Sequence, residues 1–518
     1  MNNNTESSAP FRHFRRLAGP CLRVWLCLGF AACSAAAEPR LMTLEECIAL
    51  ALENNLDCRM ERIDRTMAEL DIEAARGAYD PSLSLSASRD HKETEGTSAG
   101  TAEGVLQTTQ TQTDDNSFSA GIDGATALHG LDYALTARAG DSSGDRADNP
   151  FDTTTASVGV TLTQPLLQGF KTDQARYRVA TARKQSAEAE LQWEDQVQAS
   201  VASVESAWYA LIRAREEIAV QREALRLAEQ LQADTDRKVR VGTAFTLDAK
   251  QAESQAASAR AALSDARRAY QVAQNELKSL VFADQRAVRA FEIQTAEDLA
   301  AAPVDVDVVV AGDRALESRP DIRAKRLALE RQGLTVDWQR NQTLPSMDLV
   351  AGAGLAASDE DSYGDAWSQL GSADEPYWTV GVTFSFPLGN RAARASHRQS
   401  LATADRMQLE LRQLEESALV EVENAVAAVE TGWEKIGATR DARAYAEEAL
   451  AAEQKKLDSG KSTSFVVLQL QQQLTSARRA EIAALADYRQ QLSTLARAQG
   501  LLLEQHGLCI DSADSPEK

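Results

Sequence analysis

Two very long runs of helical periodicity dominate the chain. The first, residues 172–240, contains no proline and no glycine, and at about 1.5 Å per residue it predicts a helix of roughly 100 Å. Its apolar residues recur with the 3-4-3 spacing of a coiled-coil seam, at Val201, Val204, Trp208 and Leu211. A turn at 240–243 contains one glycine, and the helical pattern then resumes as far as residue 280. This pattern predicts a helical hairpin over residues 172–280.

The same design recurs in the second half of the chain. Residues 392–457 form another proline-free helical run, interrupted only by Gly432 and Gly437. A turn at 459–463 follows, and a returning helical run extends to residue 498. The sequence therefore predicts a second helical hairpin over residues 392–498.

Segments with period-two alternation of apolar and polar residues predict strands. They cover about 81–89 and 154–164 in the first half, and 345–355 and 377–387 in the second. The last three are barrel-length, since a membrane barrel strand needs about 9–11 residues. Four strands cannot close a barrel, and an open edge cannot lie in lipid, so several copies must assemble. Two copies would give eight strands and a filled interior, and three would give twelve and leave a pore.

A long insert at 90–153 separates the strands of the first pair. Residues 90–115 are rich in Thr, Ser, Gly and Gln, which favours an exposed loop. Residues 118–122 and 131–135 alternate in character and could form an extra hairpin around Gly130. The sequence leaves the structure of this insert open.

The two halves are related by internal similarity. Residues 52–57 align with 316–321 at an offset of 264, and the turn glycines Gly242 and Gly460 lie 218 residues apart. Such self-similarity indicates a duplicated unit. We expect a first repeat at 41–300, a second repeat at 301–503 and a C-terminal tail at 504–518. Residues 282–314, with weak periodicity, are placed as a belt where shorter helices meet beside a long one.

Residues 1–37 have the pattern of an export signal, in which a basic segment precedes a short apolar core and small residues at 35–37. A second possibility is cleavage before Cys33, where residues 30–34 approach a lipoprotein box, with lipidation of that cysteine. Ordinary cleavage is favoured because such boxes usually have Leu rather than Phe three residues before the Cys. In both cases the protein leaves the cytoplasm.

The net charge of −22 becomes about −25 when this segment is removed, which argues against nucleic acid as a partner. Cys47, Cys58 and Cys509 have no spacing that suggests a disulfide framework or a metal site. The histidines are scattered. We find no paired catalytic carboxylates, no phosphate loop and no nucleophile elbow, so neither catalysis nor a cofactor is expected.

Several of these features together resemble the TolC family of outer-membrane efflux proteins: the signal, the duplication, residues 161–167 before the long helix, and residues 459–469 at the second turn. The resemblance covers about residues 41–503. It implies a mainly α-helical homotrimer, in which each chain gives four core strands to a twelve-stranded β-barrel, and antiparallel helical hairpins form a periplasmic tunnel. The sequence departs from the family in the 90–153 insert and at Val466, where many relatives carry an acidic residue.

The resemblance further implies a passive duct in the outer membrane of a Gram-negative-type bacterium. Family members dock through a periplasmic adaptor to an inner-membrane pump of the RND, ABC or MFS type. The two helical turns would then bind the adaptor, through Arg240, Val241, Gly242, Thr243, Ser459, Gly460, Lys461, Ser462 and Thr463. The simpler interpretation is that the glycines only reverse the chain.

Four acidic residues near the turns could form rings across a tunnel mouth in a trimer: Asp234, Asp236, Glu453 and Asp458. In an acidic helical protein, simple solvation of these carboxylates is favoured. A type I protein-secretion duct is the alternative function within the same class. A secreted structural coiled-coil protein is the alternative from another class, but it does not explain the barrel-length strands.

Overall fold

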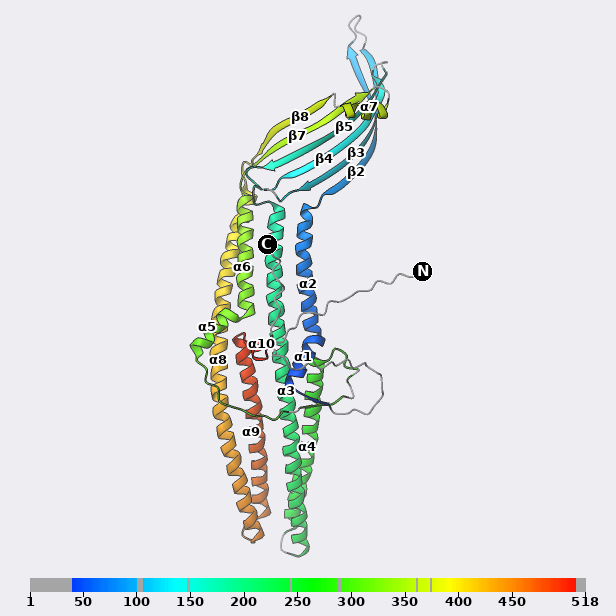
Figure 1. Cartoon of the computed structure of the whole chain (residues 1–518). Coiled ribbons are helices and arrows are strands. Elements are labelled where there is room, and N and C mark those ends of the chain that lie inside the picture. Colours follow the sequence, from blue (N-terminus) through cyan, green and yellow to red (C-terminus); the bar gives the residue numbers. More distant parts are fainter. Residues whose placement is uncertain are drawn as a thin grey trace, which may run out of the picture. The chain divides into compact units, whose positions relative to one another are not determined.

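The computed structural model in Figure 1 describes residues 40–99, 106–127, 129–146, 150–242, 245–286, 288, 291–295, 297–359, 362–372 and 375–508. The expected signal segment with Cys33, and the end of the chain beyond residue 508, lie outside these residues. The chain divides into two units. The first, called the helical unit, comprises Met1–Arg65, Glu188–Arg326 and Glu410–Lys518; the second, called the sheet unit, comprises Thr66–Ala187 and Leu327–Leu409.

Helices make up most of the described chain. They are α1 (Leu44–Asn54), α2 (Leu56–Arg76), α3 (Gln174–Arg240), α4 (Thr246–Val281), α5 (Val308–Ser318), α6 (Pro320–Asn341), α7 (Tyr363–Ser372), α8 (Arg391–Asp458), α9 (Ser464–Ala498) and α10 (Leu502–Gln505). The long helices α3 and α8 have 67 and 68 residues, as the two proline-free helical patterns predict, and α8 continues through Gly432 and Gly437. An offset of 264 carries α1 onto α5, each with 11 residues, so the element order repeats along the chain.

The core of the helical unit lies where α1, α2 and α4 pack on α3. The predicted seam residues of α3 are all buried there, including Trp208, whose side chain is fully enclosed. Leu277 near the end of α4 and Cys58 near the start of α2 belong to the same cluster. Cys47 and Cys58 are free thiols, and burial raises the pKa of Cys47 to about 12. This cluster therefore holds the ends of several helices against the middle of one long helix.

The belt expected in residues 282–314 contains a short strand that the sequence does not indicate. Strand β6 (Ile293–Thr295) pairs in parallel with β1 (Arg40–Met42), which precedes α1. The buried amide of Gln274 in α4 donates to the carbonyl of Ile293 at 2.5 Å and accepts from the Ile293 amide at 3.2 Å. One side chain thus satisfies both backbone groups of Ile293, as a neighbouring strand would.

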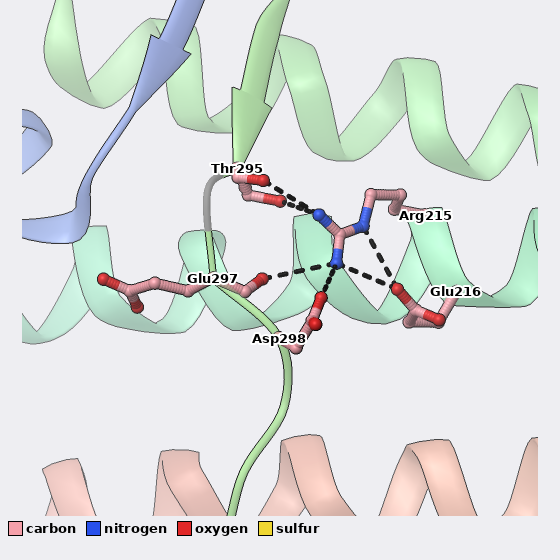
Figure 2. Close-up of polar contacts among 5 residues, drawn as sticks. All are labelled: Arg215, Glu216, Thr295, Glu297 and Asp298. Atoms are coloured by element: carbon pink, nitrogen blue, oxygen red, sulfur yellow. Dashed lines mark hydrogen bonds and ion pairs between the residues drawn. The ribbon is translucent and has the colours of Figure 1, made fainter.

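A single guanidinium fixes the end of this belt strand to α3, as Figure 2 shows. One terminal nitrogen of Arg215 donates to the carbonyl and hydroxyl oxygens of Thr295, at 2.8 and 2.9 Å. The other donates to Asp298 Oδ1 at 2.9 Å and to the Glu297 carbonyl at 3.3 Å, and Glu216 accepts from the same group. Arginine suits this position because its planar donors can reach several acceptors at once.

The sheet unit contains one antiparallel sheet in the order β2-β3-β4-β5-β7-β8. Its strands are β2 (Ser82–Ala99), β3 (Leu106–Ala125), β4 (Asp132–Arg146), β5 (Pro150–Pro165), β7 (Ser346–Asp359) and β8 (Pro376–Ser385). The four core strands expected from the sequence are present as β2, β5, β7 and β8. The hairpin left open around Gly130 is also formed, as β3 and β4, and it lies between β2 and β5, so the sheet has six strands.

Two adjacent rows of cross-strand neighbours define the faces of this sheet. The apolar row comprises Leu83, Ile122, Leu135, Val160, Ala353 and Trp378. The small-residue row, on the opposite face, comprises Ser84, Gly121, Thr136, Gly159, Gly354 and Tyr377. Because successive side chains of a strand point to opposite faces, one face of the sheet is apolar and the other carries small and polar residues.

The expected exposed loop at 90–115 is wrong for most of its length. Strand β2 continues to Ala99 and β3 begins at Leu106, with Asp90 opposite Asp115 and Thr97 opposite Thr108. The segment lacks apolar alternation, but its threonines favour extended structure. A second unexpected element is α7, whose Ala366 packs with Ala156 and Ala357 on the sheet.

Among the helices in the described part of the chain, none is both long enough and apolar enough to cross a membrane.

We expect Arg215→Met to loosen the belt, because it removes the donors that hold Thr295, Glu297 and Asp298. Hydrogen bonds to charged groups contribute about 1.5–3 kcal/mol each when buried, and Arg215 is partly exposed, so we expect a local cost of about 1–2 kcal/mol. Hydrogen exchange at the amides of Ile293–Thr295 should accelerate about tenfold.

The matched control is Arg213→Met, two residues earlier on α3. Arg213 makes an exposed ion pair of 3.5 Å with Asp487, and such pairs contribute little. Equal acceleration at Ile293–Thr295 in both variants, or none in Arg215→Met, would show that the guanidinium does not anchor the belt.

Candidate functional site

The two expected docking turns lie in the helical unit, where the α3–α4 and α8–α9 hairpins run side by side (Figure 1). A small apolar cluster joins the hairpins near these turns, with Leu231 of α3 against Leu450 of α8 and Val467 of α9. The side chain of Gln472 in α9 also donates to that of Gln255 in α4 at 2.8 Å. These contacts hold the two turns together as one candidate site, called the tips here.

The first tip ends α3 with a left-handed glycine. The amide of Gly242 donates to the Val239 carbonyl at 3.0 Å, and Gly242 has a φ of +80°. A Cβ added to this glycine would meet no atom within 4 Å. Thr243, also predicted to belong to this tip, lies outside the described residues. Arg240 and Val241 are exposed beside the glycine, so the first tip presents backbone that a partner can approach closely.

The second tip is closed by the hydrogen bonds of a Schellman motif. Gly460 has a φ of +72°, and its backbone amide donates to the Leu457 carbonyl at 3.1 Å. The backbone amide of Lys461 donates to the Lys456 carbonyl at 2.9 Å. Around Gly460 too, a Cβ would meet open space. Thr463 then precedes α9 in an extended conformation. The two glycines therefore have the same geometry in the two halves of the chain.

Large apolar side chains are exposed on both tips. Val241 and Phe245 of the first tip are 74% and 79% exposed, Leu247 is similarly open, and Phe465 of the second tip is 60% exposed. Large apolar side chains exposed together at the end of a helical hairpin are candidates for an interaction site. Our sequence-based site residues did not include Phe245, Leu247 or Phe465. The available signal was a large apolar residue within a few positions of a glycine turn, in a segment that is otherwise polar.

The four candidate acidic residues differ in their surroundings. Asp234 pairs with Arg237 at 3.0 Å, one turn further along α3. Glu453 is bound by Lys456 Nζ at 2.8 Å and by the Ser462 hydroxyl at 2.6 Å. These two contacts lower the pKa of Glu453, that from Lys456 most. Glu453 thus ties the second turn to α8, whereas Asp236 is half-buried and Asp458 is exposed.

A buried polar cluster in the helical unit holds the last described turn of the chain. His506 Nε2 lies 2.7 Å from Glu205 Oε1, and Ser493 donates to the other oxygen of this buried carboxylate. The cluster borders a cavity of about 640 Å³ that Arg314 and Arg489 also line. Through these two contacts the Glu205 carboxylate of α3 holds Ser493 of α9 and His506 after α10, so the cluster anchors the last described turn. Across the described residues, no group of three or more His, Cys, Asp or Glu could hold a metal ion.

Comparison with protein families gives one match that covers most of the chain. Residues 110–281 and 311–501 match the family described as "Outer membrane efflux protein". Among curated proteins, the chain is similar to the outer membrane efflux protein BepC of Brucella suis biovar 1 (strain 1330). The two are 26% identical over 332 residues, which cover 64% of this chain and 69% of that protein.

Solved outer-membrane channels share the fold. The CmeC outer membrane channel of Campylobacter jejuni superposes with a TM-score of 0.66 at 16% identity, covering 90% of this chain and 89% of that chain. The outer membrane protein VceC of Vibrio cholerae gives a TM-score of 0.64 at 18% identity, covering 88% of this chain and 96% of that chain. At these identities the similarity supports the fold alone.

We expect acid to loosen the second tip. Because the folded pKa of Glu453 is lowered, its carboxylate stabilises the tip at pH values above the pKa of an unfolded glutamate, about 4.3. This contribution is lost as the pH falls through the lowered folded pKa. Hydrogen exchange at residues 459–463, corrected for intrinsic rates, should therefore increase below about pH 4.

Glu453→Ala should make exchange at these residues fast at every pH, whereas Glu448→Gln, an exposed residue on the same helix, should leave the pH dependence intact. Unchanged exchange in Glu453→Ala would mean that the carboxylate does not order the tip.

Proposed function

Because the chain belongs to the outer membrane efflux protein family and is therefore an outer-membrane channel, we propose that it is the passive exit duct of a tripartite efflux or export system. Three copies assemble, with their sheets in the outer membrane and their long helices in the periplasm. The tips bind a periplasmic adaptor protein, which connects the duct to an inner-membrane transporter of the RND, ABC or MFS type.

The observation that carries the docking step is the structure of the tips. Each tip combines a left-handed glycine in open space with large exposed apolar side chains. A helical hairpin needs the glycine to reverse direction, but it does not need Phe245, Leu247 or Phe465 in water. A partner that covers these side chains and approaches the glycine backbone accounts for both features.

The sheet supports the membrane assignment. Its apolar row runs across all six strands without a charged residue, whereas the opposite row contains glycine, serine, threonine and tyrosine. Membrane barrels have this alternation, with apolar residues toward lipid and small or polar residues toward the interior. The same two-faced pattern is not required of a water-exposed structural protein.

The repeats and the acidic residues complete the proposal. The two sequence repeats, 41–300 and 301–503, each contribute one helical hairpin to the tunnel wall. When three copies meet, Asp234, Asp236, Glu453 and Asp458 could form acidic rings at the tunnel mouth that favour cations, although simple solvation of these carboxylates is the favoured interpretation. For Asp234 and Glu453 the local cations reduce this effect, because each carboxylate already has a basic partner within one helical turn.

We expect the protein in the outer-membrane fraction, released only by detergent, and we expect the released particle to be a trimer. The reason is that the open sheet cannot expose its edges to lipid, where each unsatisfied amide costs several kcal/mol. Fractionation followed by native mass measurement tests this. A soluble periplasmic protein, or a stable detergent-solubilised monomer with full strand content, would contradict the assignment.

We expect Gly242→Trp combined with Gly460→Trp to abolish export while trimer abundance stays near normal. The positive φ adds about 1–2 kcal/mol of strain at each turn, and no neighbouring atom lies where the side chain begins. The bulky side chains instead obstruct the adaptor. Export can be measured as survival on toxic compounds against which the wild-type gene protects cells.

The matched control is Gly242→Ala combined with Gly460→Ala. It introduces nearly the same backbone strain without bulk, so export should persist. Loss of export in both double variants would identify strain as the cause, and loss of trimers in proportion to export would make the glycines structural turns only.

A further inference from the structure

The hairpin β3–β4 is built into the middle of the sheet. Strand β3 pairs with β2 from Leu106 to Asp123, and β4 pairs with β5 from Asp132 to Asp145. The hairpin therefore separates β2 from β5, which would otherwise be the neighbouring strands of the first half. An extracellular flap lying over the sheet would leave β2 and β5 paired with each other.

The hairpin also matches both faces of the strands around it. In the apolar row, Ile122 and Leu135 lie between Leu83 of β2 and Val160 of β5. In the small-residue row, Gly121 and Thr136 lie between Ser84 and Gly159. Since a shift of one residue would exchange the two faces, this register is the one that a continuous lipid-facing wall requires.

The turn of the hairpin is fixed to the junction between β5 and α3. The Gln164 side chain donates to the carbonyl of His129 at 3.0 Å, and Arg176 donates to that of Ala127. Gly130 has a φ of +77°, and a Cβ there would lie 3.1 Å from the Gly169 carbonyl oxygen. A non-glycine residue would be strained and crowded at this position. The turn is thus a fitted part of the sheet unit.

The sheet ends in two edges that must find partners in lipid. Within the described sheet, β2 and β8 each pair with one neighbour. Because the sheet has an even number of strands in a fully antiparallel order, β2 and β8 run in opposite directions. The β2 edge of a second copy can therefore continue the antiparallel order beside β8, with apolar and small-residue faces aligned.

We propose that each copy contributes six strands to the barrel, so that the trimer closes a wall of eighteen strands rather than twelve. This inference rests on the proposed function, which supplies the membrane and the number of copies. The occupant of each sheet edge is a second copy of this chain, β2 of one copy against β8 of the next. Barrel diameter grows roughly linearly with strand number, so the exit is about one and a half times as wide as one of twelve strands.

The proposed lining suits the passage of bulky cargo. Thr136 has a glycine as its neighbour on each side, Gly121 and Gly159, so this part of the interior face has few projecting side chains. Tyr377 lies across the next glycines of the row, where a Cβ on Gly354 would come within 2.5 Å of its hydroxyl oxygen. A wide exit with few projecting side chains on its interior face does not itself select cargo. Selection of cargo then falls to the tips and to the partners that bind them.

Single arginine substitutions on the two faces of β4 test whether the hairpin lies in the membrane wall. Leu135, 45% exposed and in the apolar row, would face lipid, where arginine is costly near the midplane. Thr136 would face the interior, which already accommodates Arg138 two residues along on the same face. Leu135→Arg should reduce assembled trimer in the outer membrane about tenfold or more, and Thr136→Arg should change it less than about twofold.

Val160→Arg on β5 separates this inference from the proposed function. It places arginine in the apolar row on a core strand, whether or not the hairpin belongs to the wall. If Val160→Arg prevents assembly but Leu135→Arg and Thr136→Arg are both tolerated, the hairpin lies outside the membrane and the eighteen-strand barrel is wrong. If Val160→Arg is also tolerated, the membrane assignment itself fails.

Electron microscopy of the wild-type particle in lipid nanodiscs gives the strand count directly. Eighteen strands in a three-fold particle are expected, with β2 and β8 of neighbouring copies in contact. Twelve strands, formed either by three copies with the hairpin outside the wall or by two copies with six strands each, would overturn the proposal.

Discussion

The structure depends on burying the apolar face of a very long helix against several shorter ones. Isolated helices are marginal in water, and most of their stability in proteins comes from packing of an apolar face. α3 has 67 residues, whereas α2 has 21 and α4 has 36, so neither shorter helix can cover it alone. In the helical unit, Cys58 of α2 and Leu277 of α4 join the same buried cluster on α3. The belt, held by Gln274 and Arg215, fixes the place where α3 changes partner.

The second half of the chain also has a junction between two short helices, before α6, but different side-chain contacts fix it. Asn55, before α2, accepts from the amide of Asp57 at 2.8 Å and so caps the helix. At the equivalent position, Arg319 precedes α6 and binds Asp321, Glu421 and the Ala498 carbonyl. Burial lowers the pKa of this guanidinium, but its bonds to Asp321 and Glu421 raise it overall. The first repeat thus has a local cap at this position, whereas the second has an ion-pair junction that joins α6, α8 and α9.

The local sequence predicts helices and strands that have a clear periodicity. It does not predict strand pairings between segments far apart in the chain. The long helices were predictable because no Pro or Gly interrupts residues 172–240, and the tip glycines because a hairpin must reverse somewhere. The parallel pairing of β1 with β6 joins three-residue strands about 250 residues apart, and no local pattern marks it. The outer parts of β2 and β3 carry polar residues on both faces, so the alternation that identifies a half-buried strand is absent. At the tips, the glycines were found, but Phe245, Leu247 and Phe465 were not, since their exposure depends on where the hairpins end.

The inserted hairpin explains how the sheet can change while the helices stay the same. Because a hairpin adds two antiparallel strands, it does not change the direction of the strand that follows it. β5 therefore runs toward α3 in the same direction with or without the hairpin. The additional turn needs only a small site beside Pro165 and Gly169, and no additional helix. The near-equal lengths of α3 and α8, one after the enlarged strand pair and one after the simple pair, agree with this. An antiparallel sheet can therefore widen by whole hairpins, while the long helices that follow its strands keep their lengths.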